Sequence, residues 1–384
     1  MTEKLYYKDS HIHVFTARVL SCEKAKKGFA LTLDKTAFFP EGGGQPADTG
    51  LIGSAVVTDV QEREGEILHY TDRALTPGEE YACALDWEQR LCRMQNHSGE
   101  HVVSGLVHKL YGLENVGFHM GAACMTIDFS GELSWEQLTE IETLANKAVR
   151  DDIPVQTGFP APEELACMEY RSKLELSHDV RIVEIPGIDR CACCAPHVGR
   201  TGEIGLVKLL SAERHRGGVR VELVCGMDAL GACRRMQENV TAISGLLSAR
   251  REATASAVER VLAEQTRLKE RVAALSMELA RLKAERFPPT EGSICVFDNV
   301  LDEVALRELV NLLTEKCAVA GAFSGSDETG YLYIIGSRHT DLRARSREIN
   351  SAIRGKGGGT PEMIRGRASA TAEEIQKMMK TAVV

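Results

Sequence analysis

The chain has 384 residues, of which 43% are hydrophobic and 26% charged, and its formal net charge is -9. This balance excludes a disordered or fibrous protein, and the length predicts two or three domains that each bury a core. The negative charge excludes a surface that is basic all over, so any nucleic-acid contact requires a local patch. No apolar run reaches the roughly 18 residues of a membrane span, and the first residues lack the pattern of a signal peptide, so we expect a cytoplasmic protein.

The first 88 residues alternate polar and apolar positions in short segments between glycine-containing turns, which is typical of β-strands. We expect a small β-barrel here, with a sandwich as the other arrangement that the pattern permits. From Trp87 the pattern becomes helical, because LCRMQNHSGEHVVSGLVHKLYG spaces apolar residues by three and four and closes on Gly112. ACMTIDF, VRIVEI and VRVELVCG then indicate strands, and Ser134 with Gln137 gives the capping-box signal of another helix. Residues 89–228 are therefore predicted to form an α+β domain.

A heptad pattern dominates the next segment, 229–289. Two rows of residues repeat every seven positions and are offset by three: Val258, Gln265, Val272, Leu279 and Val261, Leu268, Leu275, Leu282. They predict one long helix from about Ala229 to Arg286, closed by Phe287, Pro288 and Pro289, because proline cannot continue a helix. Two interpretations stay open: a coiled coil between two copies of the chain, or a helical hairpin that packs on its own domain.

Residues 290–384 are predicted to form an α/β domain. SICVFDNV, KCAVAGAFSG and GYLYIIGS indicate strands, DEVALRELVNLLTEK indicates an amphipathic helix, and a short helix begins near Thr371. A basic stretch runs from Arg338 to Arg367, with three acids, Asp341, Glu348 and Glu362, among eight basic residues: Arg338, Arg343, Arg345, Arg347, Arg354, Lys356, Arg365 and Arg367. It is a candidate contact for nucleic-acid phosphates, although a solvated helix face would look the same.

Two spaced pairs predict a metal site. His97 and His101 lie four residues apart on the first predicted helix, which places both imidazoles on one face. Cys193 and His197 have the same spacing in a loop that contains Pro196. Three imidazoles and a thiolate suit a tetrahedral zinc ion. The twelve cysteines are otherwise scattered, which favours free thiols over disulfides, and spacing alone lets Cys191 or Cys194 replace Cys193.

These two pairs resemble the metal motifs of the editing domain of alanyl-tRNA synthetases and of the free-standing AlaX-type editing proteins. FFPEGGGQPADTG, from Phe38 to Gly50, is similar to the family's glycine-rich motif, and HVGRTGEIG and RVELVCG are similar to later stretches of the same domain. GKGGGTPEMIRGRAS resembles the glycine-rich C-terminal domain that alanyl-tRNA synthetases share with some phosphoesterases. The order matches a long AlaX-type protein. One departure is the run Cys194, Ala195, Pro196, where the family commonly has Gly-Gly-Thr.

The resemblance implies a fold and an activity. The fold is α+β: an N-terminal barrel (1–88), a zinc-binding editing domain (89–228), a long helical linker (229–289) and a C-terminal glycine-rich domain (290–384) that binds tRNA or another copy. The activity is zinc-dependent hydrolysis of the ester in alanine tRNA mischarged with serine or with glycine. Separately from the resemblance, we expect a homodimer that pairs through the helical linker or the C-terminal domain. The chain has no room for the synthetase's catalytic domain, so we expect no aminoacylation.

The resemblance and the residues together suggest roles at this site. Glu100 would act as the base for water, Thr36 would read the serine hydroxyl, and Gln45 would reach the substrate or brace its loop. Gly42, Gly43 and Gly44 would let the tRNA 3′ end approach the backbone. His197 is our choice for a metal ligand that opens for chemistry. The C-terminal tRNA contacts would come from five residues: Arg354, Lys356, Gly357, Gly358 and Gly359.

Two other functions fit part of the sequence. H-S-G-E-H also matches the H-x-x-E-H pattern of metalloproteases, in which His97 and His101 bind zinc and Glu100 is the base. That pattern needs a downstream glutamate as third ligand, and it leaves the Cys193 to His197 pair and the glycine motif unexplained. The other candidate is a non-catalytic RNA-binding dimer with a structural zinc ion.

Overall fold

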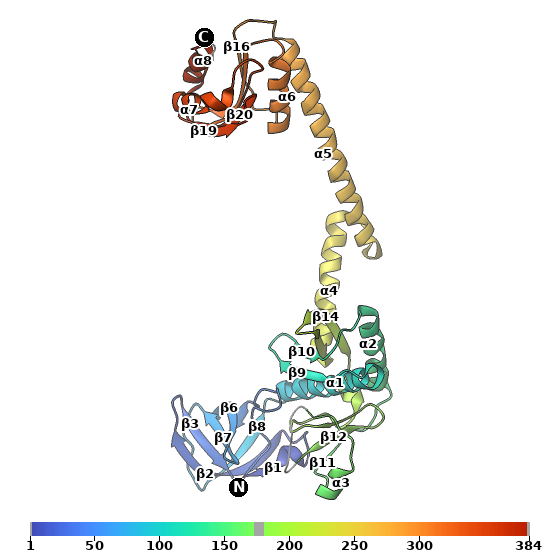
Figure 1. The fold of residues 1–384 in the computed structure, drawn as a ribbon. Helices are drawn as coiled ribbons and strands as arrows, with labels where there is room; N and C mark the ends of the chain where they lie inside the picture. The colour runs from blue at the N-terminus through green and yellow to red at the C-terminus, as the bar shows by residue number, and fades with distance from the viewer. Residues whose placement is uncertain (1, 173–179, 382–384) are drawn as a thin grey trace. The chain divides into compact units, whose positions relative to one another are not determined.

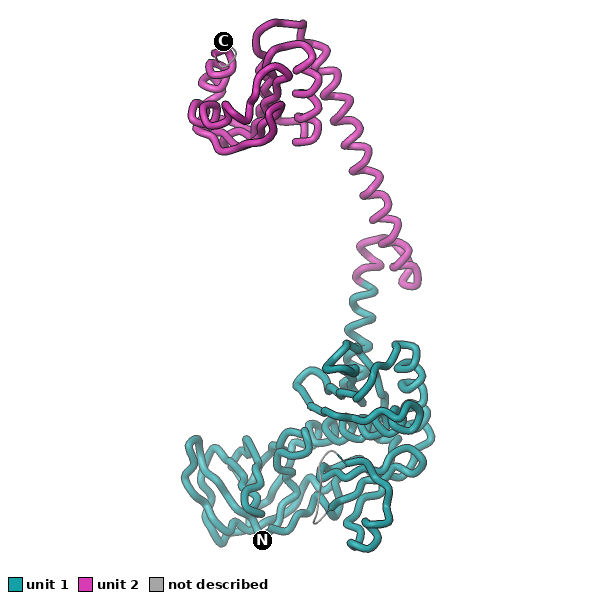
Figure 2. The backbone as a smooth tube through the Cα atoms, in the orientation of Figure 1, with its two compact units in different colours: residues 1–241 teal, residues 242–384 magenta. Residues whose placement is uncertain are grey.

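The computed structural model describes residues 2–172 and 180–381. Both helices and strands occur along these ranges, which confirms the predicted α+β class (Figure 1). The chain divides into two compact units, residues 1–241 and 242–384, and the boundary lies within one helix (Figure 2). The four segments predicted from the sequence are a finer division and stay a prediction.

Six strands of the first unit form a closed barrel in the order β2-β3-β7-β6-β5-β8. They are β2 (Val14–Lys24), β3 (Phe29–Leu33), β5 (Gly50–Ile52), β6 (Ala55–Arg63), β7 (Glu66–Thr71) and β8 (Glu80–Leu85). Alternate side chains fill the barrel, as in β7, where Ile67, His69 and Thr71 are buried. β1 (Glu3–Lys4) and the short helix η1 (Leu5–Tyr7) precede the barrel strands, and β4 (Lys35–Thr36) follows β3. β1 pairs with β4 in parallel. The loop between β4 and β5 carries the glycine-rich motif.

Helix α1 (Trp87–Tyr111) follows the barrel directly. Asp86 caps its first turn by accepting a hydrogen bond from the Gln89 amide, and Gly112 ends it with a φ of 66°, a conformation that favours glycine. Every residue from Asn96 to Val107 is buried, because α1 contacts several elements of the unit at once. The two histidines of the metal motif lie in this buried stretch.

The rest of the first unit surrounds α1. A four-stranded sheet has the order β14 (Val207–His215), β15 (Gly218–Cys225), β10 (Met125–Phe129) and β9 (Asn115–Met120). A three-stranded sheet has the order β11 (Gln156–Gly158), β12 (Ile182–Ile185) and β13 (Asp189–Ala192). The helices are α2 (Trp135–Arg150), α3 (Pro162–Ala166) and η2 (Thr201–Ile204). The predicted capping box is confirmed, because Ser134 and Gln137 bond to each other's backbone amides at the start of α2.

The single long helix predicted from Ala229 to Arg286 is wrong. The structure has two helices, α4 (Gly226–Leu247) and α5 (Thr254–Glu285), with the short helix η3 (Arg251–Ala253) between them. α4 ends because Ser248 takes a φ of 47° and the Ala249 amide donates to the Ser244 carbonyl, five residues back. The heptad rows begin only at Val258, so no apolar seam holds residues 248–253 in a helix.

The second unit contains a five-stranded sheet of order β16-β17-β18-β20-β19. The strands are β16 (Ser293–Phe297), β17 (Val319–Ser326), β18 (Gly330–Gly336), β19 (Lys356–Gly359) and β20 (Met363–Ala368), and the helices are α6 (Glu303–Leu313), α7 (Leu342–Ala352) and α8 (Ala372–Thr381). β19 is an edge strand made almost wholly of glycine. Ala280 and Ala284 of α5 are buried in the same core as α6. Along the described residues, no helix is both long enough and apolar enough to cross a membrane.

Candidate metal centre

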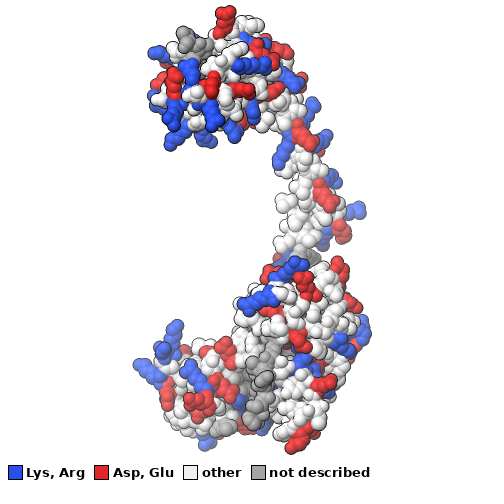
Figure 3. All heavy atoms as spheres, in the orientation of Figure 1, with Lys and Arg blue, Asp and Glu red and all other residues white. Residues whose placement is uncertain are grey.

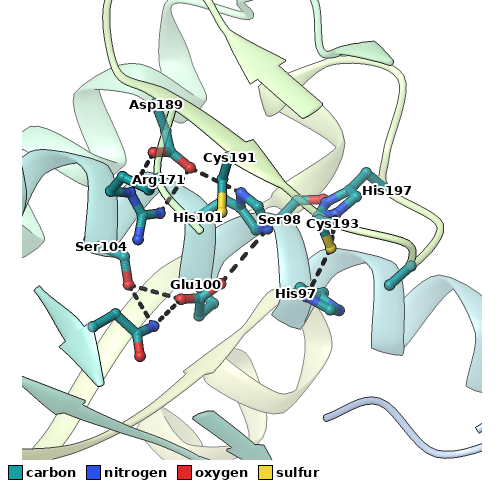
Figure 4. A network of polar contacts seen from close by, with 12 residues as sticks. His97, Ser98, Glu100, His101, Ser104, Arg171, Asp189, Cys191, Cys193 and His197 are labelled. Atoms are coloured by element: carbon teal, nitrogen blue, oxygen red, sulfur yellow. Dashed lines mark hydrogen bonds and ion pairs between the residues drawn. The ribbon is translucent and has the colours of Figure 1, made fainter. Parts of the chain in front are cut away.

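The four predicted metal ligands come together in the first unit. His97 and His101 lie one turn apart on α1, and Cys193 and His197 lie in the loop after β13 (Figure 4). One ligand atom from each of the four lies within 4.8 Å of the others. The sulfur of Cys193 is 3.6 Å from Nε2 of His97 and 3.4 Å from Nε2 of His197. Tetrahedral zinc, with bonds of about 2.0 Å to nitrogen and 2.3 Å to sulfur, holds these atoms roughly 3.5 Å apart, so the group fits zinc.

The outer nitrogen, Nδ1, of each histidine has its own hydrogen-bond partner. His97 lies 3.0 Å from Oε1 of Gln45, His101 2.8 Å from Oδ2 of Asp189, and His197 3.0 Å from Oγ of Ser98. Because Nδ1 is used in each ring, Nε2 is the atom that can bind a metal ion.

Burial and mutual charge favour the metal-binding forms of two ligands. Burial raises the pKa of the Cys193 thiol, but His97 and His197 beside it outweigh burial and bring that pKa well below its ordinary value. Burial lowers the pKa of His197 to about 3. A thiolate and a neutral imidazole are the forms that coordinate metal ions.

A cavity of about 460 Å³ opens beside this cluster. Among its lining residues are His97, His101 and Cys193, but not His197. Gly43 and Gly44 of the glycine-rich loop form part of the wall. The remaining wall includes three aromatic residues, Tyr7, Phe118 and Phe159.

Glu100 also lines the cavity and is buried. Its Oε1 accepts hydrogen bonds from Oγ of Ser104, at 2.7 Å, and from the side-chain amide of Asn115. Its Oε2 lies 3.8 Å from Nε2 of His101, the atom that faces the metal position. The carboxylate thus has a fixed orientation next to the cluster, unlike the solvated glutamate common on exposed helices.

Comparisons with known proteins relate the chain to proteins named for alanyl-tRNA editing or synthesis. Residues 180–222 match the family described as "Threonyl and Alanyl tRNA synthetase second additional domain". The alanyl-tRNA editing protein AlaX-L of Pyrococcus horikoshii is 29% identical over 98% of this chain and 96% of its own length, and Aarsd1 of Mus musculus is 25% identical over 95% and 94%. The chain thus resembles the AlaX-type alanyl-tRNA editing proteins along nearly its whole length. The alanine–tRNA ligase of Pyrococcus abyssi is 30% identical over 99% of this chain, which spans only 43% of that ligase.

The glycine-rich loop turns tightly beside the cluster. Gly42 and Gln45 exchange two backbone hydrogen bonds, of 3.1 and 3.0 Å, around Gly43 and Gly44, whose φ angles are 60° and 81°. These angles favour glycine, and a Cβ atom on Gly44 would lie 2.8 Å from the Phe118 ring. The turn brings Gln45 under His97. The Nε2 atom of Gln45 is buried without a hydrogen-bond partner in the described part of the chain.

Thr36 lies in the barrel core and is not among the residues that line the cavity. Its hydroxyl is 2.8 Å from Nε2 of His69 and accepts a hydrogen bond from the Phe38 amide. Nδ1 of His69 lies 3.3 Å from the Leu31 carbonyl oxygen, which can only accept. The Thr36 hydroxyl therefore donates to Nε2 of His69. Its predicted role as a substrate contact stays a prediction.

A buried ion pair that the sequence analysis missed joins the glycine-rich loop to α1. Asp48 accepts from Nε of Arg90 at 2.8 Å and from the Phe39 amide at 2.7 Å, while Arg90 also donates to the carbonyls of Ser10 and Ala37. We call this pair the Asp48–Arg90 clasp. Arg90 lies two turns before His97, so the clasp fixes the loop relative to the metal cluster. Neither residue has a pattern that would have pointed to the other.

The loop that contains Cys194, Ala195 and Pro196, where the sequence departs from the family pattern, is held by packing and by hydrogen bonds. Ala195 is buried against the barrel core. Arg181 donates to the carbonyls of Cys193, at 3.0 Å, and Ala195, at 2.8 Å. Cys191 is buried near His101, and the more open Cys194 lines the cavity, but neither belongs to the four-residue metal group.

The C-terminal residues predicted to contact tRNA lie in the second unit. Figure 3 shows Lys and Arg side chains gathered on the side of this unit where Figure 1 places α7 and β19. Four of the eight basic residues are paired with acids: Arg338 with Glu315, Arg345 with Glu348, Arg354 with Glu374 and Arg365 with Glu303. Lys356 and Arg367 are exposed and face each other across β19 and β20.

Proposed function

We propose that the chain hydrolyses the ester that joins serine, or glycine, to the terminal ribose of alanine tRNA, using zinc held by His97, His101, Cys193 and His197. One observation carries the proposal: a zinc-type ligand group opens into a cavity beside the glycine-rich loop. Support comes from similarity, along nearly the whole chain, to proteins named alanyl-tRNA editing proteins. We also propose that the chain does not aminoacylate tRNA.

The chemistry divides between the ion and the chain. A zinc ion held by these residues would supply Lewis acidity to an ester carbonyl and lower the pKa of a bound water to about 7, provided that one of the four ligands opens, the role that we assign to His197. Glu100 is our candidate base: Oε2 takes a proton from the attacking water and returns it to the ribose oxygen as the ester bond breaks. The orientation of its carboxylate by Ser104 and Asn115 supports this role.

The glycine-rich loop is our candidate for holding the substrate. Gly43 and Gly44 line the cavity, so their backbone is accessible to the tRNA 3′ end. Nε2 of Gln45 is a buried donor without a partner among the described residues, and leaving such a group unpaired costs about 1–3 kcal/mol. A substrate oxygen at this donor would recover that energy. Gln45 thus joins Thr36 as a candidate for recognising the aminoacyl group.

The second unit is our candidate for binding the body of the tRNA. Two like charges placed opposite each other on neighbouring strands repel, and Lys356 and Arg367 are such a pair. Phosphate would relieve this repulsion. The three exposed glycines of β19, Gly357, Gly358 and Gly359, leave the strand's backbone open to a nucleic acid. Arg354 is already paired with Glu374, so Lys356 and Arg367 are the better candidates.

We propose further that two copies pair through α5. The heptad side chains from Val258 to Leu282 are largely exposed within the second unit, with exposed fractions of 41% for Val258 and 60% for Val272. An apolar heptad row of this kind is the surface that coiled coils bury. Sedimentation of the full chain should give a dimer, and the Val272→Glu variant should give a monomer. An unchanged mass would contradict pairing through this helix.

The catalytic proposal is tested with alanine tRNA charged separately with serine, glycine and alanine. The protein should hydrolyse the serine and glycine esters and spare the alanine ester. His97→Ala should abolish hydrolysis, whereas His108→Ala should not, because His108 lies on the same helix but is exposed and paired with Glu114. Equal hydrolysis of all three esters, or an active His97→Ala variant, would contradict the proposal.

A further inference from the structure

The three histidines of the metal cluster differ in the hydrogen-bond partner of Nδ1, the ring nitrogen that points away from the cluster. His97 faces a neutral amide, on Gln45, and His197 faces a neutral hydroxyl, on Ser98. Only His101 faces a carboxylate, that of Asp189, at 2.8 Å (Figure 4). A carboxylate makes the imidazole a stronger electron donor at its other nitrogen than a neutral acceptor does.

Asp189 is itself held in place. Arg171 donates to both carboxylate oxygens, from Nε to Oδ1 at 2.7 Å and from Nη2 to Oδ2 at 2.9 Å. Asp189 starts β13, which packs closely on α1 because Gly105, one turn after His101, has no side chain. A Cβ atom on Gly105 would lie 2.6 Å from Cβ of Asp189. The backbone and the guanidinium together fix where the carboxylate points.

His101, Asp189 and Cys191 also lie close enough to resemble a second metal group. The surrounding contacts argue against an ion there. Both oxygens of Asp189 already accept from Arg171, and Nδ1 of His101 is used by Asp189. A divalent cation would have to sit beside the largely buried guanidinium of Arg171, whose positive charge repels it. The group serves the neighbouring cluster instead.

We propose that Asp189, held by Arg171, is a positioning residue that fixes the ring of His101 and makes His101 the anchoring nitrogen ligand of the zinc site. The inference rests on the proposed zinc site but not on the proposed tRNA substrate. Loss of a carboxylate in this position weakens metal binding by about 10–100-fold in known zinc sites.

The test measures zinc affinity by competition with a chromogenic chelator, using the full chain stripped of metal. Asp189→Asn should bind zinc about 10–100-fold more weakly than the unmodified chain. Asp128→Asn is the matched control, since Asp128 accepts from Arg220 at 2.7 and 2.8 Å and lies 3.7 Å from a histidine, His215, yet is no part of the metal cluster. Its zinc affinity should not change.

A zinc affinity of Asp189→Asn within twofold of the unmodified chain would overturn the inference. If that variant does not fold, Arg171→Gln and its control Arg220→Gln replace the pair, and only Arg171→Gln should weaken zinc binding. Failure of the proposed function looks different: a chain that binds zinc with the expected dependence on Asp189 but leaves mischarged tRNA intact would refute the deacylase and retain this inference. A chain that binds no zinc would refute both.

Discussion

The Asp48–Arg90 clasp gives the sharpest prediction about stability. Asp48 and Arg90 are 1% and 0% exposed, so each residue neutralises the charge of the other, which has no access to water. Asp48→Ala leaves the guanidinium with two carbonyl partners but no counter-charge, and it leaves the Phe39 amide without its acceptor. Removing one member of a buried pair costs about 3–5 kcal/mol, and we expect a loss of that size.

Urea denaturation measures this loss by intrinsic fluorescence, because the only two tryptophans, Trp87 and Trp135, both lie in the first unit. The control is Glu80→Ala, which removes an exposed partner of Arg18 on the barrel and should leave the transition in place. The double variant Asp48→Ala, Arg90→Met should regain part of the stability, since it removes the buried guanidinium together with its carboxylate. The recovery is only partial because Arg93, 3.7 Å from Asp48, still loses its partner. A loss below about 1 kcal/mol for Asp48→Ala would refute the reasoning.

Three further predictions concern the barrel and the second unit. Burial lowers the pKa of His69 from 6.5 to about 4, so on acidification the unfolded chain takes up the proton before the folded chain does. The free energy of unfolding should therefore be constant above pH 6.5 and fall by about 3 kcal/mol as the pH drops to 4. His69→Gln should remove this pH dependence in urea titrations. Thr36→Val should cost about 1–3 kcal/mol because Nε2 of His69 loses its donor, and an unchanged stability would contradict that bond. Replacing Lys356 and Arg367 by glutamine should lower the salt dependence of tRNA binding, measured by anisotropy, by roughly one in slope for each phosphate that is no longer neutralised, whereas Arg338→Gln should not.

The metal ligands could be predicted from the sequence because each pair of ligands lies within five consecutive residues. A spacing of four residues on one helix places His97 and His101 together, and the same spacing in a loop supplies Cys193 and His197. The outer partners could not be predicted in this way. Asp189 meets His101 only because β13 packs on α1, and no pattern near Arg171 indicates that its guanidinium holds that carboxylate.

The long helix and Thr36 also show that short-range patterns are predictable from the sequence, whereas contacts that depend on packing are not. The heptad rows predict a helix where α5 lies, but their first residue is Val258. The residues before Val258 have no apolar row of their own that would continue the helix. The break at Ser248 depends on one positive φ angle, which composition does not reveal. The resemblance to the family suggests Thr36 as the contact for the serine hydroxyl, whereas the structure places the Thr36 hydroxyl against His69 inside the barrel. The partner of a buried hydroxyl depends on strand pairing, which the sequence leaves open.

Removal and return of zinc tests the central claim most directly. The full chain is stripped by a chelator, its folding is checked by circular dichroism, and hydrolysis of serine-charged alanine tRNA is followed before and after one equivalent of zinc is added. We predict that hydrolysis stops in the stripped protein and returns with zinc. A folded, zinc-free protein that hydrolyses the ester at the original rate would contradict the account.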